Sequence, residues 1–303
     1  MTDLRGEDFL RLDDVDERSL TSLLDDAAEL KRRPVRDALS DRSLGMLFQK
    51  RSTRTRVSFE VGMTELGGHA VFLSSDDIQL GRGETVADTA RALSRYVDVL
   101  MARVYDYDDV SALAEHSDVP VVNGLSDFNH PCQALSDAFT LRETYDDLDG
   151  VEVAWVGDGN NVCHSLLHLL PRLGVGVRVA TPEGFEPDVD VVERARSLAV
   201  EPGYVDVVRD PGEAVEGVDA VYTDTWVSMG EEGKDVSVFE NYRVDPELMS
   251  AADESAVFMH CLPAHRGQEV VDDVIDGPRS VVWRQAENRL HAQKALLVAL
   301  AGD

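Results

Sequence analysis

The sequence predicts an α/β protein of two domains, each a parallel sheet flanked by helices. Two observations predict this class. Short apolar runs typical of buried strands alternate with stretches whose apolar residues recur at helical spacing. The alternation breaks at the polar segment 146–150 and then restarts, in a chain of 303 residues that is long enough for two cores. We therefore expect one domain at residues 1–145, a second at 146–284, and a C-terminal helical segment at 285–303.

The first domain opens with a predicted helix at 16–32, where leucines recur at helical spacing. Proline at position 131 suits the first turn of another helix, which runs to about residue 145. Between these two helices, the pattern predicts strands at 45–48, 69–73, 99–102 and 119–122, and helices around 59–66, 85–96 and 110–114.

The second domain repeats the alternation. Strands are expected at 151–156, 175–180, 218–222 and 257–259, with a last short strand at 281–283. Helices are expected at 162–173, 188–200 and 285–300. Because open parallel sheets bind ligands at the carboxyl ends of their strands, the residues that follow these strands are the candidates for function.

The charge balance indicates in which solvent the protein works and which partners it is unsuited to. The chain has 29 basic and 58 acidic residues, a net charge of −29, and only four of the basic residues are lysines. The acidic residues are spread along the chain, which indicates a surface adapted to concentrated salt, where screening weakens self-repulsion. Such an exterior argues against nucleic acid as a partner.

Location follows from three features of the sequence. No apolar run approaches the length of a membrane span, and the N-terminal residues lack the apolar core of a signal peptide. The three cysteines, Cys132, Cys163 and Cys261, are too few for a disulfide framework. We therefore expect a cytoplasmic protein that makes no contact with a membrane.

The segment Ser52-Thr53-Arg54-Thr55-Arg56 stands where the strand at 45–48 passes into a helix. A helix start offers free N–H groups and the positive end of the helix dipole. Hydroxyls add short donors, and arginine adds a planar fork that suits phosphate. The segment thus predicts a phosphate clamp, with a capped helix start and a solvated basic face as the alternative interpretation.

Polar side chains also follow the other predicted strands. In the first half these are Arg103, His130 and Gln133. In the second half they are Asp158, Asn160, Asn161 and Asp224, followed by the segment His260-Cys261-Leu262-Pro263. We expect the polar residues of the two domains to converge on one cleft.

Simpler interpretations stay open for several of these residues. A single histidine before a helix, such as His130, is usually a cap or a surface residue, and Cys261 can be a small buried apolar residue. The adjacent His260 and Cys261 suggest a metal site, but the Cys-x-x-Cys pairs and histidine spacings of zinc sites are missing. The glycines at 157 and 159 resemble half of a dinucleotide fingerprint, without its third glycine.

Taken together, the motifs resemble the aspartate/ornithine carbamoyltransferase family. The family-wide ones are Ser52-Thr53-Arg54-Thr55-Arg56, Asp88-Thr89-Ala90-Arg91 and His130-Pro131-Cys132-Gln133-Ala134-Leu135-Ser136-Asp137. Three others resemble the ornithine-specific members: Gly157-Asp158-Gly159-Asn160-Asn161-Val162, Asp224 with Ser228-Met229-Gly230, and His260-Cys261-Leu262-Pro263. The resemblance runs from about residue 4 to the C-terminal helix, without a departure at these motif positions.

The resemblance implies a carbamoyl phosphate site. The residues that would hold the phosphate are Ser52, Thr53, Arg54 and Thr55. Donors for the carbamoyl oxygen would come from Thr55, Arg103 and His130. Hydrogen bonds from the carbamoyl nitrogen would be accepted by Gln133 and by the backbone of Cys261 and Leu262. Arg289 would complete the site from a C-terminal helix that packs back on the first domain.

The resemblance also implies a second substrate and an assembly. The residues that would bind L-ornithine are Asn161, Asp224, Ser228 and Met229, and those expected to take part in catalysis are Arg103, His130, Asp224 and Cys261. The ornithine amine would attack the carbamoyl carbon, and phosphate would leave to give L-citrulline, with no metal or organic cofactor. Gln79 would lie on a loop that reaches a neighbouring subunit of a homotrimer or a multiple of trimers.

Three alternatives stay open. A sister enzyme acting on aspartate would need positive groups for a dicarboxylate in the second domain. A sister acting on putrescine or another amine shares most of the motifs. A non-catalytic binding or regulatory subunit could retain the fold, although the donors at Arg54, Arg103 and His130 are intact. The sequence does not decide between arginine synthesis and arginine breakdown.

Overall fold

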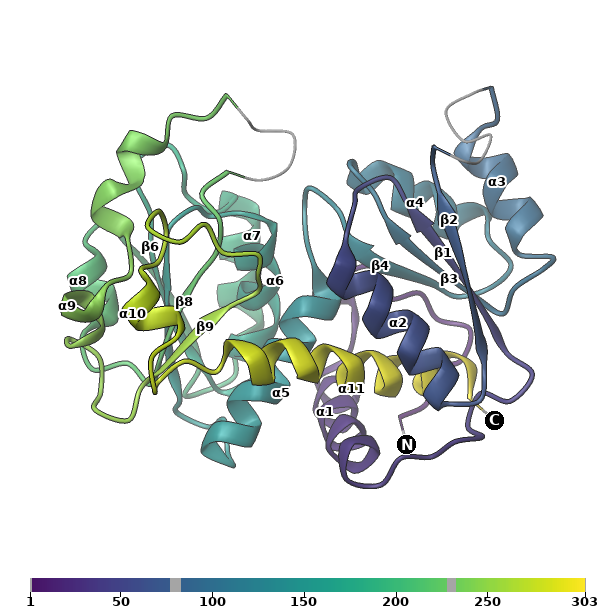
Figure 1. Cartoon of the computed structure of the whole chain (residues 1–303), viewed down its shortest axis with the longest axis horizontal. Coiled ribbons are helices and arrows are strands. Elements are labelled where there is room, and N and C mark those ends of the chain that lie inside the picture. The colour runs from purple at the N-terminus through teal and green to yellow at the C-terminus, as the bar shows by residue number, and fades with distance from the viewer. Residues whose placement is uncertain (1, 77–82, 228–232, 303) are drawn as a thin grey trace. The chain divides into compact units, whose positions relative to one another are not determined.

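The chain forms two compact units in a computed structural model that describes residues 2–76, 83–227 and 233–302 (Figure 1). Unit 1 consists of Met1–Phe139 and Asn288–Asp303, and unit 2 of Thr140–Glu287. The chain passes between them within two helices, α5 (Pro131–Tyr145) and α11 (Val282–Ala301). The domain boundaries expected from the sequence, at 145/146 and 284/285, fall in or at the end of these two helices.

Unit 1 is built on a parallel sheet of four strands in the order β2-β1-β3-β4. The strands are β1 (Ser43–Phe48), β2 (His69–Ser74), β3 (Val99–Arg103) and β4 (Val121–Leu125). All of β3 and β4 is buried. Strand β4 is at an edge of the sheet, where Phe9 forms an isolated parallel bridge with Val122. The edge strand β2 is partly exposed along its length.

The helices of unit 1 cover this sheet and carry its polar site. They are α1 (Glu17–Arg32), α2 (Thr53–Glu65), α3 (Val86–Leu93), α4 (Tyr107–His116), the start of α5 and the end of α11, with a 3-10 turn at Leu12–Asp14. Leu100 and Val121 of the sheet share a buried cluster with Ala90 of α3 and Val110 of α4. On α2, a Cβ at Gly62 would lie 3.3 Å from Lys294 Cγ, so glycine permits the close approach of α11.

Unit 2 is built on a parallel sheet of five strands in the order β7-β6-β5-β8-β9. The strands are β5 (Glu152–Val156), β6 (Gly176–Ala180), β7 (Tyr204–Val208), β8 (Ala220–Thr223) and β9 (Val257–His260). The helices are α6 (Asn161–Leu169), α7 (Val189–Leu198), α8 (Pro211–Val215), α9 (Pro246–Met249) and α10 (Asp272–Ile275), with 3-10 helices at Leu170–Leu173 and Val236–Tyr242. The rings of Trp155 and Tyr222 stack with their centroids 5.1 Å apart inside the unit.

The predicted fold class is confirmed, including a C-terminal helix that packs on the first unit. On that helix, Arg289 and Lys294 bind Thr55 and Glu65 of α2. The strand predicted at 281–283 is wrong, because Val282 begins α11. The strand-like pairing stops at Ser280, which forms an isolated bridge with Phe258.

Strand β7 was not predicted. It is an edge strand in which Asp206 is exposed and only Val205 is fully buried, so it lacks the continuous apolar run that marked the other strands of its sheet. Across the residues described here, no helix combines the length and the apolar character that crossing a membrane requires.

Candidate active site

The start of α2 is a capped helix that also carries buried donors. The hydroxyl of Ser52 accepts a hydrogen bond from the backbone N–H of Thr55 at 3.2 Å, which is the N-cap arrangement. Arg56 fits the interpretation of a solvated basic face, since it is exposed, pairs with Glu60 at 3.0 Å and stacks over Phe72. Thr55 does not fit it, because its side chain is completely buried.

Two guanidinium groups meet at the hydroxyl of Thr55. Arg289 donates from Nη2 to Thr55 Oγ1 at 2.6 Å, and Arg103 donates from Nη1 to the same oxygen at 3.5 Å. Arg103 is the last residue of β3 and is 7% exposed, while Arg289 on α11 is 3% exposed. Buried guanidiniums at the carboxyl end of a parallel sheet, beside a helix start, form a strong anion-binding arrangement.

His130 lies within the field of these arginines. Burial lowers the pKa of His130 well below its usual 6.5, and the positive charges of Arg289, Arg103 and Arg54 lower it further. The imidazole is therefore neutral near pH 7, with one nitrogen able to donate and the other able to accept. We name Arg54, Thr55, Arg103, His130 and Arg289 the arginine cluster of unit 1.

The loop before α5 holds His130 in place. The backbone N–H of Ser126 donates to the carbonyl of Asn129 at 2.9 Å, and the Asn129 amide donates to the carbonyl of Leu10 at 3.0 Å. Ser126 and Asn129 are buried, so the loop is fixed by satisfied polar groups. One turn into α5, Gln133 is 1% exposed and donates from Nε2 to Oδ1 of Asp137 at 2.8 Å.

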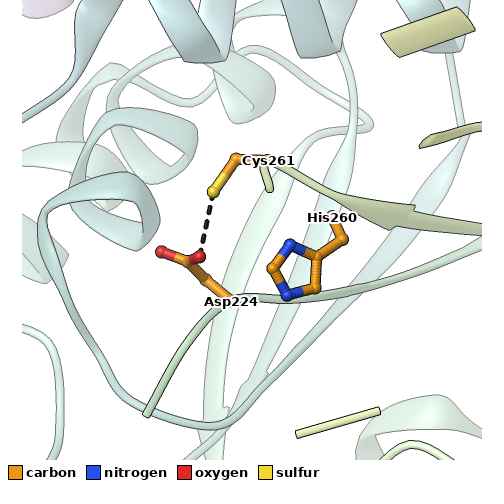
Figure 2. Close-up of side chains that lie close together, drawn as sticks. All are labelled: Asp224, His260 and Cys261. Carbon is orange, nitrogen blue, oxygen red and sulfur yellow. Dashed lines mark hydrogen bonds between the residues drawn. The ribbon is translucent and has the colours of Figure 1, made fainter. Parts of the chain in front are cut away.

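The candidate residues of unit 2 are brought together by strand register. Thr223 at the end of β8 pairs with His260 at the end of β9, so Asp224 and Cys261 leave the sheet side by side. The Cys261 thiol donates to Oδ1 of Asp224 at 2.9 Å (Figure 2). The amide of Asn160 donates to Oδ2 of Asp224 at 2.9 Å, so both carboxylate oxygens are held.

Asn160 also builds the start of α6. Its Oδ1 accepts from the backbone N–H groups of Val162 at 3.0 Å and Cys163 at 3.2 Å, which makes it the N-cap. Asn161, the predicted ligand, is the first residue of α6 and is half-buried. The helix start and the carboxylate of Asp224 are therefore fixed by one side chain.

His260 fixes the segment that follows β9. Its Nδ1 accepts from the backbone N–H of Leu262 at 2.9 Å, so Nε2 carries the proton and donates to Glu269 Oε1 at 3.2 Å. The backbone N–H of His260 donates to Gln285 Oε1 at 2.9 Å. Leu262 has a φ of 60°, a conformation that a leucine keeps only where neighbouring contacts impose it.

Asp224, His260 and Cys261 also have the chemistry of metal ligands. Their ligand atoms lie within 4.8 Å of one another (Figure 2). Both imidazole nitrogens of His260 already take part in hydrogen bonds, and the Cys261 thiol is bound to Asp224. A metal ion would therefore have to displace one of the contacts that order this segment.

The other predicted residues divide into three groups. Gln79, Ser228 and Met229 lie outside the described residues. Ser52 is half-buried, as are Arg54 and Leu262, while Thr53 is exposed at the helix start. The thiols of Cys132 and Cys163 are buried, and burial raises the pKa of Cys132 to about 12, so they behave as small apolar residues.

The sequence-based prediction placed Asn160 and Asp137 in family motifs without assigning either a contact, and it did not include Glu269. Asn160 stands next to the predicted ligand Asn161, and an Asx residue before a helix is a typical cap. Asp137 lies one turn after Gln133, a spacing that favours a hydrogen bond on a helix face. Glu269 lay in no motif, and its contact with His260 depends on tertiary structure.

Two parallel α/β units with polar side chains at the carboxyl ends of their strands define a two-domain α/β protein whose first unit carries buried arginines beside a helix start. Comparison with known families supports a narrower statement. Residues 7–143 match the model of the aspartate/ornithine carbamoyltransferase carbamoyl-P binding domain, and residues 149–300 match that of the Asp/Orn binding domain. The chain belongs to the aspartate/ornithine carbamoyltransferase family.

Individual relatives cover nearly the whole chain. The chain is 53% identical to an ornithine carbamoyltransferase of Pyrococcus abyssi over 99% of its length and 97% of the relative. It is also 53% identical to the anabolic ornithine carbamoyltransferase of Pyrococcus furiosus, over 99% of the chain and 98% of the relative. The solved ornithine carbamoyltransferase from Pyrococcus furiosus matches with a TM-score of 0.96 and 52% identity, over 99% of both chains.

Proposed function

We propose that the protein transfers the carbamoyl group of carbamoyl phosphate to the side-chain amine of L-ornithine, giving L-citrulline and phosphate. The observation that carries this function is 53% identity, over 99% of the chain, to a relative named ornithine carbamoyltransferase. The arginine cluster supports the first substrate, because buried guanidiniums at a helix start suit a small phosphorylated anion.

In this proposal, unit 1 holds carbamoyl phosphate. Ser52, Thr53, Arg54 and Thr55 bind the phosphate and stabilise the charge that it gains on leaving. Arg103 and His130 direct donors at the carbamoyl oxygen, where negative charge develops as the carbon becomes tetrahedral. The neutral His130 donates one N–H without adding a charge that would compete with the arginines for the phosphate.

Unit 2 holds the amine substrate in this proposal. Asn161, Asp224, Ser228 and Met229 bind L-ornithine, and Asp224 with Cys261 presents its side-chain amine in the neutral, nucleophilic form. The amine nitrogen forms a bond to the carbamoyl carbon, the bond from that carbon to the phosphate oxygen breaks, and the proton that the amine loses ends on the departing phosphate. The hydrogen bonds from Cys261 and Asn160 support this role, because they fix both oxygens of Asp224.

The test offers three amines separately with carbamoyl phosphate. Citrulline should form with L-ornithine, and carbamoyl products should be near background with putrescine and with L-aspartate. A preference for putrescine or aspartate would assign the chain to a sister activity. The absence of transfer to all three amines would support a non-catalytic subunit instead.

Direction, assembly and location belong to the same proposal. The relative from Pyrococcus furiosus is named anabolic, which supports citrulline synthesis as the working direction. We infer a homotrimer or a multiple of trimers, in which Gln79 of one subunit completes the site of the next. A cytoplasmic location is consistent with the three free thiols.

Adaptation to concentrated salt is also proposed, and the placement of lysine supports it. The four lysines are all in specific contacts: Lys31 with Asn288 at 2.8 Å, Lys234 with Asp158 at 2.8 Å, Lys294 with Glu65 at 2.7 Å, and Lys50 over the ring of Tyr105. None of the four is exposed: Lys50 and Lys294 are buried, and Lys31 and Lys234 are half-buried. Lysine is therefore kept for internal contacts, and the solvent-facing cations are arginines.

A further inference from the structure

We propose that Asp137 fixes the amide orientation of Gln133 and so makes the site select a carbamoyl group over an acyl group of the same shape. The inference rests on the proposed function, because Gln133 is expected to accept from the carbamoyl nitrogen. Asp137 acts through Gln133, so it is a positioning residue that sets specificity.

The geometry of the pair determines which end of the amide faces the carboxylate. Gln133 and Asp137 lie one turn apart on α5, and their exposures are 1% and 0%. Gln133 Nε2 donates to Asp137 Oδ1 at 2.8 Å. In this contact the carboxyl oxygen of Asp137 accepts, so the NH2 group of Gln133 faces Asp137.

This orientation leaves the other end of the amide as an acceptor. Gln133 Oε1 is buried and has no hydrogen-bond partner among the described residues. A buried acceptor without a partner is unfavourable, so the site favours a ligand that brings a donor to this oxygen. The backbone N–H of Gln133 donates to the carbonyl of His130, which places the residue on the turn of α5 next to the arginine cluster.

The rest of the cluster does not distinguish a carbamoyl group from an acetyl group. Arg54, Arg103 and Arg289 are donors only, and they can bind the phosphate and the carbonyl oxygen of either compound. On the carbonyl carbon, carbamoyl phosphate carries an NH2 group and acetyl phosphate carries a methyl group. An acceptor fixed at Gln133 Oε1 can bind the NH2 group of carbamoyl phosphate, whereas the methyl group of acetyl phosphate would leave this oxygen without a hydrogen bond.

The test compares the binding of these two phosphates to the intact protein. The measured quantity is the inhibition constant of acetyl phosphate divided by the Michaelis constant of carbamoyl phosphate. Asn at position 137 both donates and accepts, so Asp137→Asn no longer fixes the amide of Gln133. This variant should lower the ratio about tenfold, through weaker binding of carbamoyl phosphate with little change for acetyl phosphate.

A reversed pair provides the rescue. In the double variant Gln133→Glu with Asp137→Asn, the new amide donates to the new carboxylate, and the second oxygen of that carboxylate is an acceptor in either orientation. The net charge of the pair is unchanged, and the ratio should return towards that of the parent. Asp98→Asn is the matched control, because Asp98 accepts from Ser43 N at 2.8 Å at the amino end of the same sheet.

The outcomes separate this inference from the proposed function. Equal weakening of both phosphates in Asp137→Asn would indicate a merely structural role and overturn the inference, as would an unchanged ratio or a failed rescue in a folded double variant. If Asp137→Asn does not fold, Asp137→Ser removes the fixed acceptor with a smaller side chain and should give the same fall. A parent protein that makes no citrulline would instead overturn the proposed function.

Discussion

The thiol of Cys261 donates a hydrogen bond to Oδ1 of Asp224 at 2.9 Å. The contact follows from strand register, since the two residues directly follow the paired residues Thr223 and His260. It links the second half of the proposed ornithine site to a segment that His260 and Glu269 hold rigid. A thiol in this position orients a carboxylate, and its chemistry does not require a covalent intermediate.

The first prediction concerns that thiol. Cys261→Ser retains a donor for Asp224 and should retain measurable activity with weaker binding of ornithine, whereas Cys261→Ala should raise the Michaelis constant for ornithine about tenfold more. Steady-state kinetics with ornithine varied at saturating carbamoyl phosphate measures both effects. Trapping a carbamoylated Cys261 during turnover would contradict a positioning role.

The second prediction concerns Thr55. Thr55→Val keeps the shape of the side chain but removes the oxygen that binds Arg289 and Arg103. Loss of a hydrogen bond to a charged group costs roughly 1.5–3 kcal/mol. The Michaelis constant for carbamoyl phosphate should therefore rise by about one to two orders of magnitude.

The control for this substitution lies on the same helix. Thr64 is exposed, and its hydroxyl donates to the carbonyl of Glu60 at 2.9 Å. Thr64→Val should leave both Michaelis constants unchanged. An equal effect of the two threonine substitutions would show that Thr55 has no special relation to the phosphate.

The third prediction concerns the stability of the fold in acid. The pKa of His130 is held well below 6.5 in the native state, by burial first and then by the neighbouring arginines. In the unfolded chain, His130 binds a proton near pH 6.5, whereas in the native state it stays neutral at that pH. The free energy of unfolding therefore falls as the pH drops through that value. His130→Gln does not titrate and should lose less stability on acidification.

Urea unfolding in molar salt at about pH 8 and about pH 5.5 measures this difference. The control is His69→Gln, because His69 is exposed at the start of β2. That variant should follow the parent at both pH values. If His130→Gln also follows the parent, His130 is protonated in the native state over this range.

The fourth prediction tests a site shared between subunits. Gln79 is proposed to complete the site next door, while Arg103 acts within its own subunit. Mixing an inactive Gln79→Ala variant with an inactive Arg103→Ala variant should restore part of the activity by forming mixed sites. Subunit exchange, verified by tagging one variant, is the control, and no recovery after exchange would count against the shared site.

The fifth prediction is a requirement for salt. With a net charge of −29, carboxylates repel one another over roughly 30 Å at 0.01 M salt but over only about 3 Å at 1 M. Self-repulsion opposes both the fold and its assembly, so dialysis to low salt should abolish the activity and the assembled mass. Activity and sedimentation mass against potassium chloride concentration test this. Full activity of an intact assembly in dilute buffer would mean that the acidic surface serves another purpose.

Patterns local in the chain were sufficient for much of the fold. The helix expected from Pro131 to about residue 145 is found at Pro131–Tyr145, because proline fixes its first turn and a polar break follows it. The pair Val281 and Val282 misled the prediction, since β-branched residues favour strands while tertiary packing makes Val282 the start of α11.

The site shows the same division between local and tertiary information. The cap at Ser52 could be predicted from neighbouring residues, but the bond from Arg289 to Thr55 joins residues 234 positions apart. No periodicity encodes such a contact, and only the resemblance to a family indicated it. The hydrogen bond from Asn160 to Asp224 likewise depends on β5 and β8 being neighbours in the sheet.

Unit 2 is one continuous segment, whereas unit 1 is completed by residues 288–303, which follow unit 2 in the chain. The ribosome therefore makes Arg289 only after all of unit 2. At about 5–20 residues per second, the 234 positions between Thr55 and Arg289 take roughly 10–50 s to synthesise. Throughout that interval the nascent chain lacks the guanidinium that binds Thr55, so the arginine cluster of unit 1 is finished among the last steps of translation.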